Sequence, residues 1–430
     1  MSKIVADNIS PRGSDVTIAG VGTFSSSGVN LTGVVTATSF VGDVTGNATG
    51  LSGSPTLSGI TSVSTTNLTV NGNAYPNGGP LSNRNIVING AMQVAQRGTS
   101  STSSGVVTVD RFTSSWGGGA VTTTQESLTS GSPYNEGFRN YARLTNTTGA
   151  TGASNYRELF YKIEAQDLAN SGWNCASSSS YVTISFWIRS SVSQDYYFFL
   201  ESRDGSNQIY SSPFTLSADT WTKVTKTIPG GASVQIDNDN GLGALFTFIA
   251  FYGTDFTDSG NTDETWRARD AADKFTLDMT NTWAGTTNAT FDITGVQLEV
   301  GSVATPFEHR SFGDELARCQ RYYQKSYDYE TAPGTAVSQG TIQHGYTSMP
   351  ASNYVARFGA QFRTSMRAQP TVVTYDTAGN SGKCNYPDTS TNQSFTIIHR
   401  GQNNFSAETS SLSNGTDARL YFHYTAEAEL

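Results

Sequence analysis

The sequence predicts an all-β protein, and two observations support this. The chain of 430 residues has 22 Phe, 20 Tyr, 43 Gly and 12 Pro among many Val, Ile and Thr, a mixture of strand formers and turn formers. Several segments also alternate apolar and polar residues with the period of two that a half-buried strand requires, most clearly residues 181–189 (YVTISFWIR). Because this length exceeds one ordinary core, we expect two or three domains.

Charge, hydropathy and cysteine content exclude several classes of protein. A net charge of −9 with no basic run argues against nucleic-acid binding. The longest apolar stretch, residues 244–252, is about half the roughly 20 residues that cross a bilayer, so we expect no membrane insertion. We see no signal peptide, because the first residues lack an apolar segment. Cys175, Cys319 and Cys384 lie far apart and predict reduced thiols, in keeping with synthesis in a reducing cytoplasm.

Residues 1–80 predict a thin β-stalk that forms only between copies of the chain. The first 72 residues contain five charged residues and two aromatic residues. Strands as short as 16–18 and 68–70 cannot offset their ordering entropy, about 1–2 kcal/mol per residue, so we expect three parallel copies to bury their small apolar side chains together. A flexible linker is the alternative. The residues expected to pack in the stalk are Val16, Ile18, Leu31, Val35, Leu68 and Val70.

Residues 81–310 predict one β-sandwich of the jelly-roll type. Residues 203–207 (RDGSN) are typical of a hairpin turn between two strands. Residues 244–252 are apolar enough for a central strand, and residues 289–299 are expected to form the last strand of the sandwich. Many short strands with regular turns favour a double-sheet sandwich. The further expected strands are 181–189, 196–202, 208–210 and 221–228.

The end of the chain predicts a helix and a small β-domain. Residues 311–330 form the helix and connector, with Ser311 and Asp314 as capping residues and Leu316 and Cys319 on one face. Residues 331–430 again alternate as strands and predict a C-terminal β tip domain.

Particular strings resemble a known group of proteins, the tail fibres and related virion appendages of phages. The N-terminal string is similar to repeats in structural proteins of marine phages, cyanophages especially. The strings are 39–50 (SFVGDVTGNATG), 85–98 (NIVINGAMQVAQRG), 109–112 (VDRF), 295–310 (GVQLEVGSVATPFEHR), 315–323 (ELARCQRYY), 362–370 (FRTSMRAQP) and 424–430 (YTAEAEL).

The resemblance implies a homotrimeric, virion-attached fibre protein with a carbohydrate-binding-module-like jelly roll. It implies attachment to other tail or baseplate proteins through the N-terminus. The charged residues of these strings suit structural ion pairing better than ligand binding, because buried charges persist only when paired. We expect Asp110 and Arg111 to tie the first strand to the closing segment, where Glu299 and Arg310 lie.

No motif predicts catalysis, so we expect no enzyme and no cofactor. The four histidines are scattered without metal-ligand spacing. Residues 237–241 (DNDNG) resemble the start of a calcium loop, but position twelve is Phe248 rather than Glu. We expect a turn there, with a weak structural Ca²⁺ as the alternative. A glycan depolymerase would need paired carboxylates in a groove, and the sequence cannot select a pair.

Sugar binding suits the composition better, because sugar rings stack on aromatic side chains and hydrogen-bond to carboxylates and amides. For each single aromatic residue, a place in the core or in a trimer interface is the alternative. Trp187 and Trp221 are assigned to the sandwich core. The candidate glycan-binding residues are Trp116, Tyr252, Trp266, Trp283, Asp255 and Asp258.

The function predicted from the sequence is recognition of a host-surface glycan or lipopolysaccharide by a phage tail fibre. Three weak sites on one fibre would raise avidity without a tight single contact. The first alternative is an architectural virion component, a capsid fibre or a tail connector or tip, without receptor binding. The second is the depolymerase.

Overall fold

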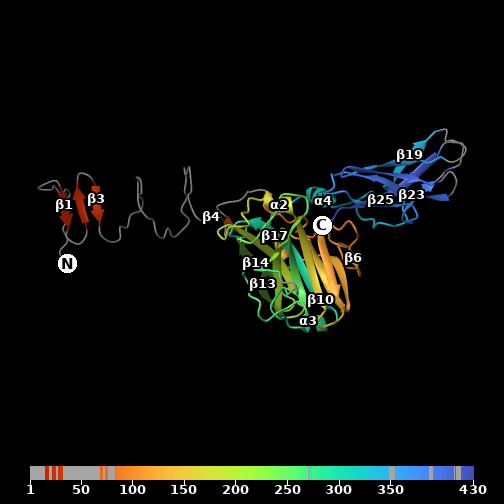
Figure 1. The fold of residues 1–430 in the computed structure, drawn as a ribbon. Coiled ribbons are helices and arrows are strands. Elements are labelled where there is room, and N and C mark those ends of the chain that lie inside the picture. Colours follow the sequence, from red (N-terminus) through yellow and green to blue (C-terminus); the bar gives the residue numbers. More distant parts are fainter. Residues whose placement is uncertain are drawn as a thin grey trace. The chain divides into compact units, whose positions relative to one another are not determined.

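The structure is a computed structural model of the whole chain, shown in Figure 1. It describes the backbone of five short strands within the first 82 residues. It also describes residues 83–430, apart from 270, 271, 273, 348–353, 387–390, 411 and 413–417. Two compact units divide the chain, Met1–Ser64 and Thr65–Leu430.

The described strands of the N-terminal segment are three or four residues long, as its alternating residues predict. One antiparallel sheet has the order β1-β2-β3, and β4 pairs with β5 in a hairpin. The side chains of the predicted stalk residues, and all of Val35, lie outside the described residues. Stalk and trimer therefore remain predictions. The bounds are β1 (Asp15–Ile18), β2 (Gly22–Ser25), β3 (Gly28–Leu31), β4 (Leu68–Val70) and β5 (Asn73–Tyr75).

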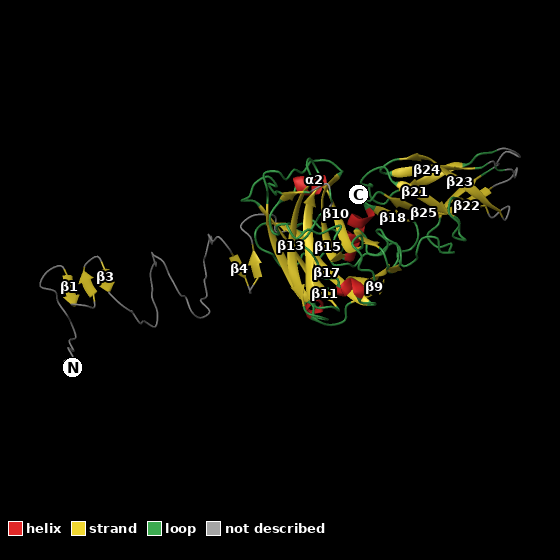
Figure 2. Ribbon diagram, turned by 60° about the horizontal axis from the view of Figure 1, so that its bottom comes forward, coloured by secondary structure: helices red, strands yellow, loops and turns green. Residues whose placement is uncertain are grey.

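Two six-stranded antiparallel sheets form a β-sandwich, as the sequence predicts (Figures 1 and 2). The first sheet has the order β16 (Arg267–Ala268), β13 (Gln208–Leu216), β12 (Gln194–Ser202), β15 (Leu242–Tyr252), β10 (Tyr156–Glu164) and β7 (Phe112–Gly117). The second has the order β14 (Thr222–Pro229), β11 (Tyr181–Ser190), β17 (Ala289–Val300), β9 (Asn140–Thr148), β8 (Ala120–Ser127) and β6 (Ser100–Ser101).

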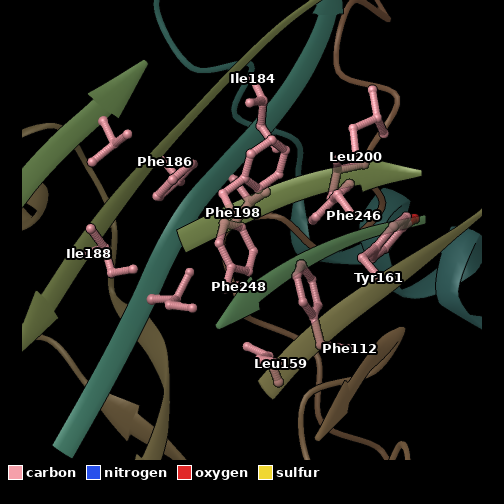
Figure 3. Packing of buried hydrophobic residues seen from close by; sticks show 14 of the residues in the cluster. Phe112, Leu159, Tyr161, Ile184, Phe186, Ile188, Phe198, Leu200, Phe246 and Phe248 are labelled. Atoms are coloured by element: carbon pink, nitrogen blue, oxygen red, sulfur yellow. The ribbon is translucent and has the colours of Figure 1, made fainter. Parts of the chain in front are cut away.

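The main core lies between these two sheets, because alternate residues of each strand point inward. Val182, Ile184, Phe186 and Ile188 of β11 are fully buried in it, which confirms the alternation predicted for this strand. Phe186 packs edge-on against Phe248 of β15, with ring centroids 4.7 Å apart. Figure 3 shows the Phe198 and Phe248 rings close together within this core.

Two smaller apolar clusters cover the outer faces of the sandwich. On the second sheet, Trp187 is buried beside Phe138 and Tyr141, and Trp221 packs against them. The assignment of Trp187 and Trp221 to the main core is therefore wrong, since both lie on the outer face of that sheet. On the first sheet, the segment after β15 supplies Phe256, Phe275, Leu277 and Met279 to a cluster on outward residues of the strands.

Three short helices and one longer one lie in the described part of the chain. The longest, α4, begins after Ser311, whose Oγ accepts a hydrogen bond from the Asp314 amide at 3.2 Å, as the capping pattern predicts. Cys319 and Tyr322 are fully buried against Ile88 and Val94, with Leu316 beside them. The bounds are α1 (Ser132–Asn135), α2 (Ala165–Ala169), α3 (Thr282–Gly285) and α4 (Phe312–Gln320).

The C-terminal strands form an eight-stranded sheet with its own aromatic core (blue in Figure 1). Its main path is β18-β25-β22-β23-β24-β20, and β19 and β21 also pair with β25. Phe358, Phe395 and Phe422 meet in its interior, with Phe358 and Phe395 4.5 Å apart. The bounds are β18 (Tyr323–Lys325), β19 (Ile342–Tyr346), β20 (Arg357–Gln361), β21 (Thr371–Tyr375), β22 (Lys383–Tyr386), β23 (Thr391–Arg400), β24 (Asn404–Thr409) and β25 (Ala418–Glu427).

Candidate functional site

A groove of about 390 Å³ lies on the outer face of the first sheet, and we call it the outer groove. Its lining combines six aromatic rings with five charged side chains, the composition that a sugar-binding site requires. The lining residues are Tyr156, Glu158, Phe160, Lys162, Phe199, Glu201, Arg203, Leu242, Leu245, Thr247, Tyr252, Phe256, Arg269 and Phe275.

Strand register determines which side chains form the floor of the outer groove. Phe160 of β10 and Phe199 of β12 both lie opposite Thr247 of the central strand β15. Lys162 and Glu201 lie opposite Leu245 in the same way. These residues share one face because side chains two apart along a strand point to the same side.

One wall of the outer groove is aromatic and comes from the segment after β15. Phe256 contacts Tyr156 and Tyr252 with ring centroids 5.4 and 5.5 Å apart. Phe275 stacks on Phe199 at 5.3 Å. Phe199 is only 3% exposed, whereas Phe160 is partly exposed on the open part of the sheet. Tyr156, Phe256 and Phe275 are also partly exposed, but each of them packs against another ring, so Phe160 is the ring best placed to stack on a sugar.

The charged side chains of the floor lie opposite different residues of the central strand β15. Both oxygens of Glu201 accept hydrogen bonds from Arg203 Nη1 at 3.3 Å, and Oε1 also accepts from Arg269 Nη1 at 3.2 Å. Glu158 lies opposite Ile249 of β15 and accepts a hydrogen bond from the Tyr252 hydroxyl. The pKa of Glu158 is raised to about 7, chiefly by burial; the hydrogen bond from Tyr252 lowers it, and the negative charge of Glu201 raises it.

The stability of the fold should depend on the protonation of Glu158. Its folded pKa of about 7 lies above the ordinary value of 4.5, so the folded state keeps a proton that the unfolded chain loses. Stability should therefore fall as the pH rises from about 4.5 to 7, and then level off. Glu158→Gln should remove this dependence and be more stable than wild type by roughly 1–2 kcal/mol at pH 8. Urea unfolding at pH 5 and pH 8 measures the free energy of unfolding of the wild type and of the variant.

The matched control for that experiment is Glu330→Gln, since Glu330 is an exposed glutamate outside the groove. Its unfolding free energy should follow wild type at both pH values. If Glu158→Gln shows the same loss of stability between pH 5 and pH 8 as wild type, another group titrates there.

The structure buries two of the predicted glycan-binding aromatic residues. Trp283 of α3 is fully buried, and its Nε1 donates to the Thr290 carbonyl oxygen at 3.0 Å. A ring without exposed surface cannot stack on a sugar, so the prediction for Trp283 is wrong. Tyr252 is 4% exposed and contributes mainly its hydrogen bond to Glu158 in the outer groove.

The other predicted glycan-binding residues lie apart from the lining of the outer groove. Trp116 and Trp266 are partly buried against the main core, and the Nε1 of Trp266 donates to the Pro229 carbonyl oxygen at 2.6 Å. Asp255 and Asp258 are exposed, and Asp258 accepts from the Gly260 amide within its own turn. None of these four residues shares a site with Phe160.

The four residues predicted for structural ion pairing are buried and paired, but with partners other than those expected. Asp110 contacts Arg97 at 3.5 Å, and Arg111 pairs with Glu429 near the end of the chain. Glu299 lies 3.7 Å from Arg84 and accepts from the Thr305 amide at 2.8 Å. Arg310 contacts Glu308 and Glu315 at 3.4 and 3.5 Å. The expected link from Asp110 and Arg111 to the closing segment is therefore wrong, because Asp110 pairs with Arg97 and Arg111, just before β7, pairs with Glu429.

In the described residues, no group of three or more His, Cys, Asp or Glu side chains is arranged to hold a metal ion. Asp239 Oδ1 accepts from the Gly241 amide at 2.8 Å within a turn, and the Asp237 amide donates to Asp204 Oδ2 at 2.8 Å. The three cysteines are free. No described helix is both long and apolar enough to traverse a bilayer.

A second, larger cavity lacks the aromatic surface of the outer groove. It measures about 670 Å³ and lies next to α2 and α4. Its lining is mainly amide and guanidinium groups, with Tyr322 as its one aromatic ring. The outer groove is therefore the better candidate for sugar binding.

The sequence analysis missed the central residues of the outer groove: Phe160, Phe199, Glu158, Glu201 and Lys162. Aromatic residues within strands usually belong to the core, so a composition argument favours platforms in turn-rich stretches. The usable signal was the alternation in 156–163 (YRELFYKI), which separates Tyr156, Glu158, Phe160 and Lys162 from the inward residues.

Comparison with known proteins gives weak likenesses only. No family model matches the chain, and no curated protein matches it. Among solved structures, the enzymatically active domain of tailspike protein 4 of bacteriophage CBA120 has 12% identity and a TM-score of 0.29, covering 53% of this chain and 24% of that one. This chain thus spans about a quarter of the length of that domain.

Two sugar-binding proteins give similar values. A putative sugar-binding protein from Bacteroides thetaiotaomicron has 12% identity and a TM-score of 0.27, covering 50% of this chain and 99% of that one. TmCBM61 in complex with β-1,4-galactotriose has 10% identity and a TM-score of 0.25, covering 50% and 97%. These scores are too low to support an argument about function. The function is therefore inferred from the residues of the outer groove and from the sequence.

Proposed function

We propose that the outer groove binds a glycan and that the protein is the host-recognition part of a phage tail fibre. The observation that carries this proposal is a partly exposed ring, Phe160, among charged hydrogen-bonding groups on a rigid sheet. Such a surface offers a sugar both a stacking face and partners for its hydroxyls. A rigid sheet also keeps the ordering cost of binding low.

The tail-fibre part of the proposal is supported by the sequence strings that resemble phage fibre proteins. Residues 1–80 would attach to tail or baseplate proteins and assemble three chains, and the protein would reside on the virion. Three outer grooves on one fibre would bind a dense host surface or its lipopolysaccharide with high avidity. An architectural component without receptor binding is the competing proposal.

We further propose that the outer groove binds its glycan without cleaving it. Glu158 and Glu201 lie opposite Ile249 and Leu245, four residues apart on β15. This offset corresponds to roughly 13 Å along the strands. The carboxyl groups themselves are close enough for the charge of Glu201 to raise the pKa of Glu158, so the case against cleavage comes from their contacts. Both oxygens of Glu201 are also engaged by arginines, which leaves it poorly placed to act as a base.

The test is saturation binding of the purified full chain to host cells, with sedimentation equilibrium to measure its mass. We expect saturable binding that soluble host glycan competes away, and a mass of three chains. Non-saturable or absent binding would favour the architectural role, and a monomer would overturn the trimeric stalk. Shortening of the glycan in a digest would show that the protein is an enzyme.

A further inference from the structure

Positive charge is concentrated at one end of the outer groove. Lys162, Arg203 and Arg269 line it there, and Glu201 is the carboxylate among them. The lining as a whole carries these three cations and the carboxylates of Glu158 and Glu201, an excess of one positive charge. This excess stands out because the chain as a whole has a net charge of −9.

Glu201 is too well covered to serve as a hydrogen-bonding partner for a ligand. Its side chain is 2% exposed, whereas those of Arg203 and Arg269 are 30% and 22% exposed. Arg203 uses only Nη1 toward Glu201, and within the described residues no other partner contacts its guanidinium. Because a guanidinium has five N–H donors, Arg203 retains donors that face the groove.

Lys162 lies in a positive environment. Burial lowers its pKa, and the charge of Arg203 lowers it further, as do Arg111 and Arg367, against the opposite effect of Glu429. Its Nζ donates to the main-chain oxygen of Leu430 and has two further donors. An anion bound beside Lys162 would relieve the repulsion between these cations.

The stacking ring and the cations lie next to each other. Phe160 and Lys162 are alternate residues of β10, so they are roughly 7 Å apart on the same face. Lys162 Nζ lies 5.9 Å from the centroid of the Phe160 ring. A sugar that stacks on Phe160 would therefore bring its substituents within reach of Lys162.

We propose that the outer groove selects acidic glycans, with a carboxylate or sulfate group held by Lys162 and Arg203 and the sugar ring stacked on Phe160. This inference rests on the proposed glycan-binding function. Charge-assisted hydrogen bonds from these two cations would make the anionic group the main determinant of affinity.

The experiment compares matched acidic and neutral oligosaccharides on the full chain by isothermal titration calorimetry. One arm uses tetragalacturonate and its methyl ester, and a second uses mannuronate oligosaccharides and their methyl esters. A third arm uses sulfated galactan oligosaccharides and their desulfated forms. At least one acidic oligosaccharide should bind about tenfold or more tightly than its neutral counterpart. The pair that shows the difference distinguishes carboxylate from sulfate.

Lys162→Gln should reduce affinity for the acidic oligosaccharide about tenfold and leave affinity for the neutral one within about twofold. Lys223→Gln is the matched control, because Lys223 belongs to β14 of the second sheet and pairs with Glu136 there. Its affinities should equal those of wild type. Thermal unfolding of each variant shows whether it is folded. The comparison of acidic with neutral oligosaccharides uses the wild-type chain, so it tests the inference even if a variant fails to fold.

The outcomes separate this inference from the proposed function. Equal or tighter binding of the neutral members would refute acidic selectivity and leave glycan binding intact. Unchanged acidic binding by Lys162→Gln would place the anion elsewhere and overturn the assigned site. Binding to no member of any pair would overturn both the inference and the proposed function.

Discussion

Phe160→Ala is expected to lower the affinity for glycan by about tenfold to a hundredfold. Phe160 is the partly exposed ring in the middle row of the outer groove, opposite Thr247. Central aromatic residues in binding sites contribute on the order of 2 kcal/mol when truncated, because they supply most of the desolvated contact area. Titration calorimetry with the oligosaccharides above measures the loss.

A matched control for this variant is Phe312→Ala. Phe312 is 44% exposed on α4, and it packs edge-on against Tyr329 away from the groove. This variant should bind glycan as wild type does. If Phe160→Ala and Phe312→Ala lose no affinity, or lose it equally, the ring of Phe160 is not the stacking platform.

Arg111→Met is expected to destabilise the fold by about 3 kcal/mol. The Arg111 side chain is 1% exposed and pairs with Glu429. Its guanidinium lies 3.4 Å from the centroid of the Tyr322 ring, and Nη2 donates to the Lys162 carbonyl oxygen at 2.8 Å. Removing one member of a buried pair leaves the other charge without its partner, which is costly. Urea denaturation measures the difference.

The control for Arg111 is Arg357→Met, which removes an ion pair on the surface. Arg357 contacts Glu408 at 2.9 Å, but its side chain is 69% exposed. Because exposed pairs contribute about 0–1 kcal/mol, this variant should unfold almost as wild type does. Equal destabilisation by the two substitutions would contradict the importance of the Arg111 contacts.

Arg111 also illustrates a local feature that no sequence pattern indicated. Its φ of 75° lies in the left-handed region, which costs a residue other than glycine on the order of 1 kcal/mol. The buried contacts with Glu429 and Tyr322 offset this cost. Arg111 and Glu429 are 318 positions apart in the chain, so their pairing could not be read from spacing.

The sequence by itself determined the β class, six of the sandwich strands and the helix. These features depend on short-range patterns, such as the alternation in 181–189 and the cap at Ser311, which act within a few residues of the chain. The sequence also indicated that Asp110, Arg111, Glu299 and Arg310 would be paired, since buried charges require partners.

Only the tertiary structure decided which residues form the outer groove. Phe160, Phe199 and Glu201 belong to strands β10 and β12, which become near neighbours because both pair with β15. Strand order depends on how two whole sheets bury their apolar faces, which is a property of the entire chain. The same packing buried Trp283 and left Phe160 partly exposed, although both are aromatic residues near strands.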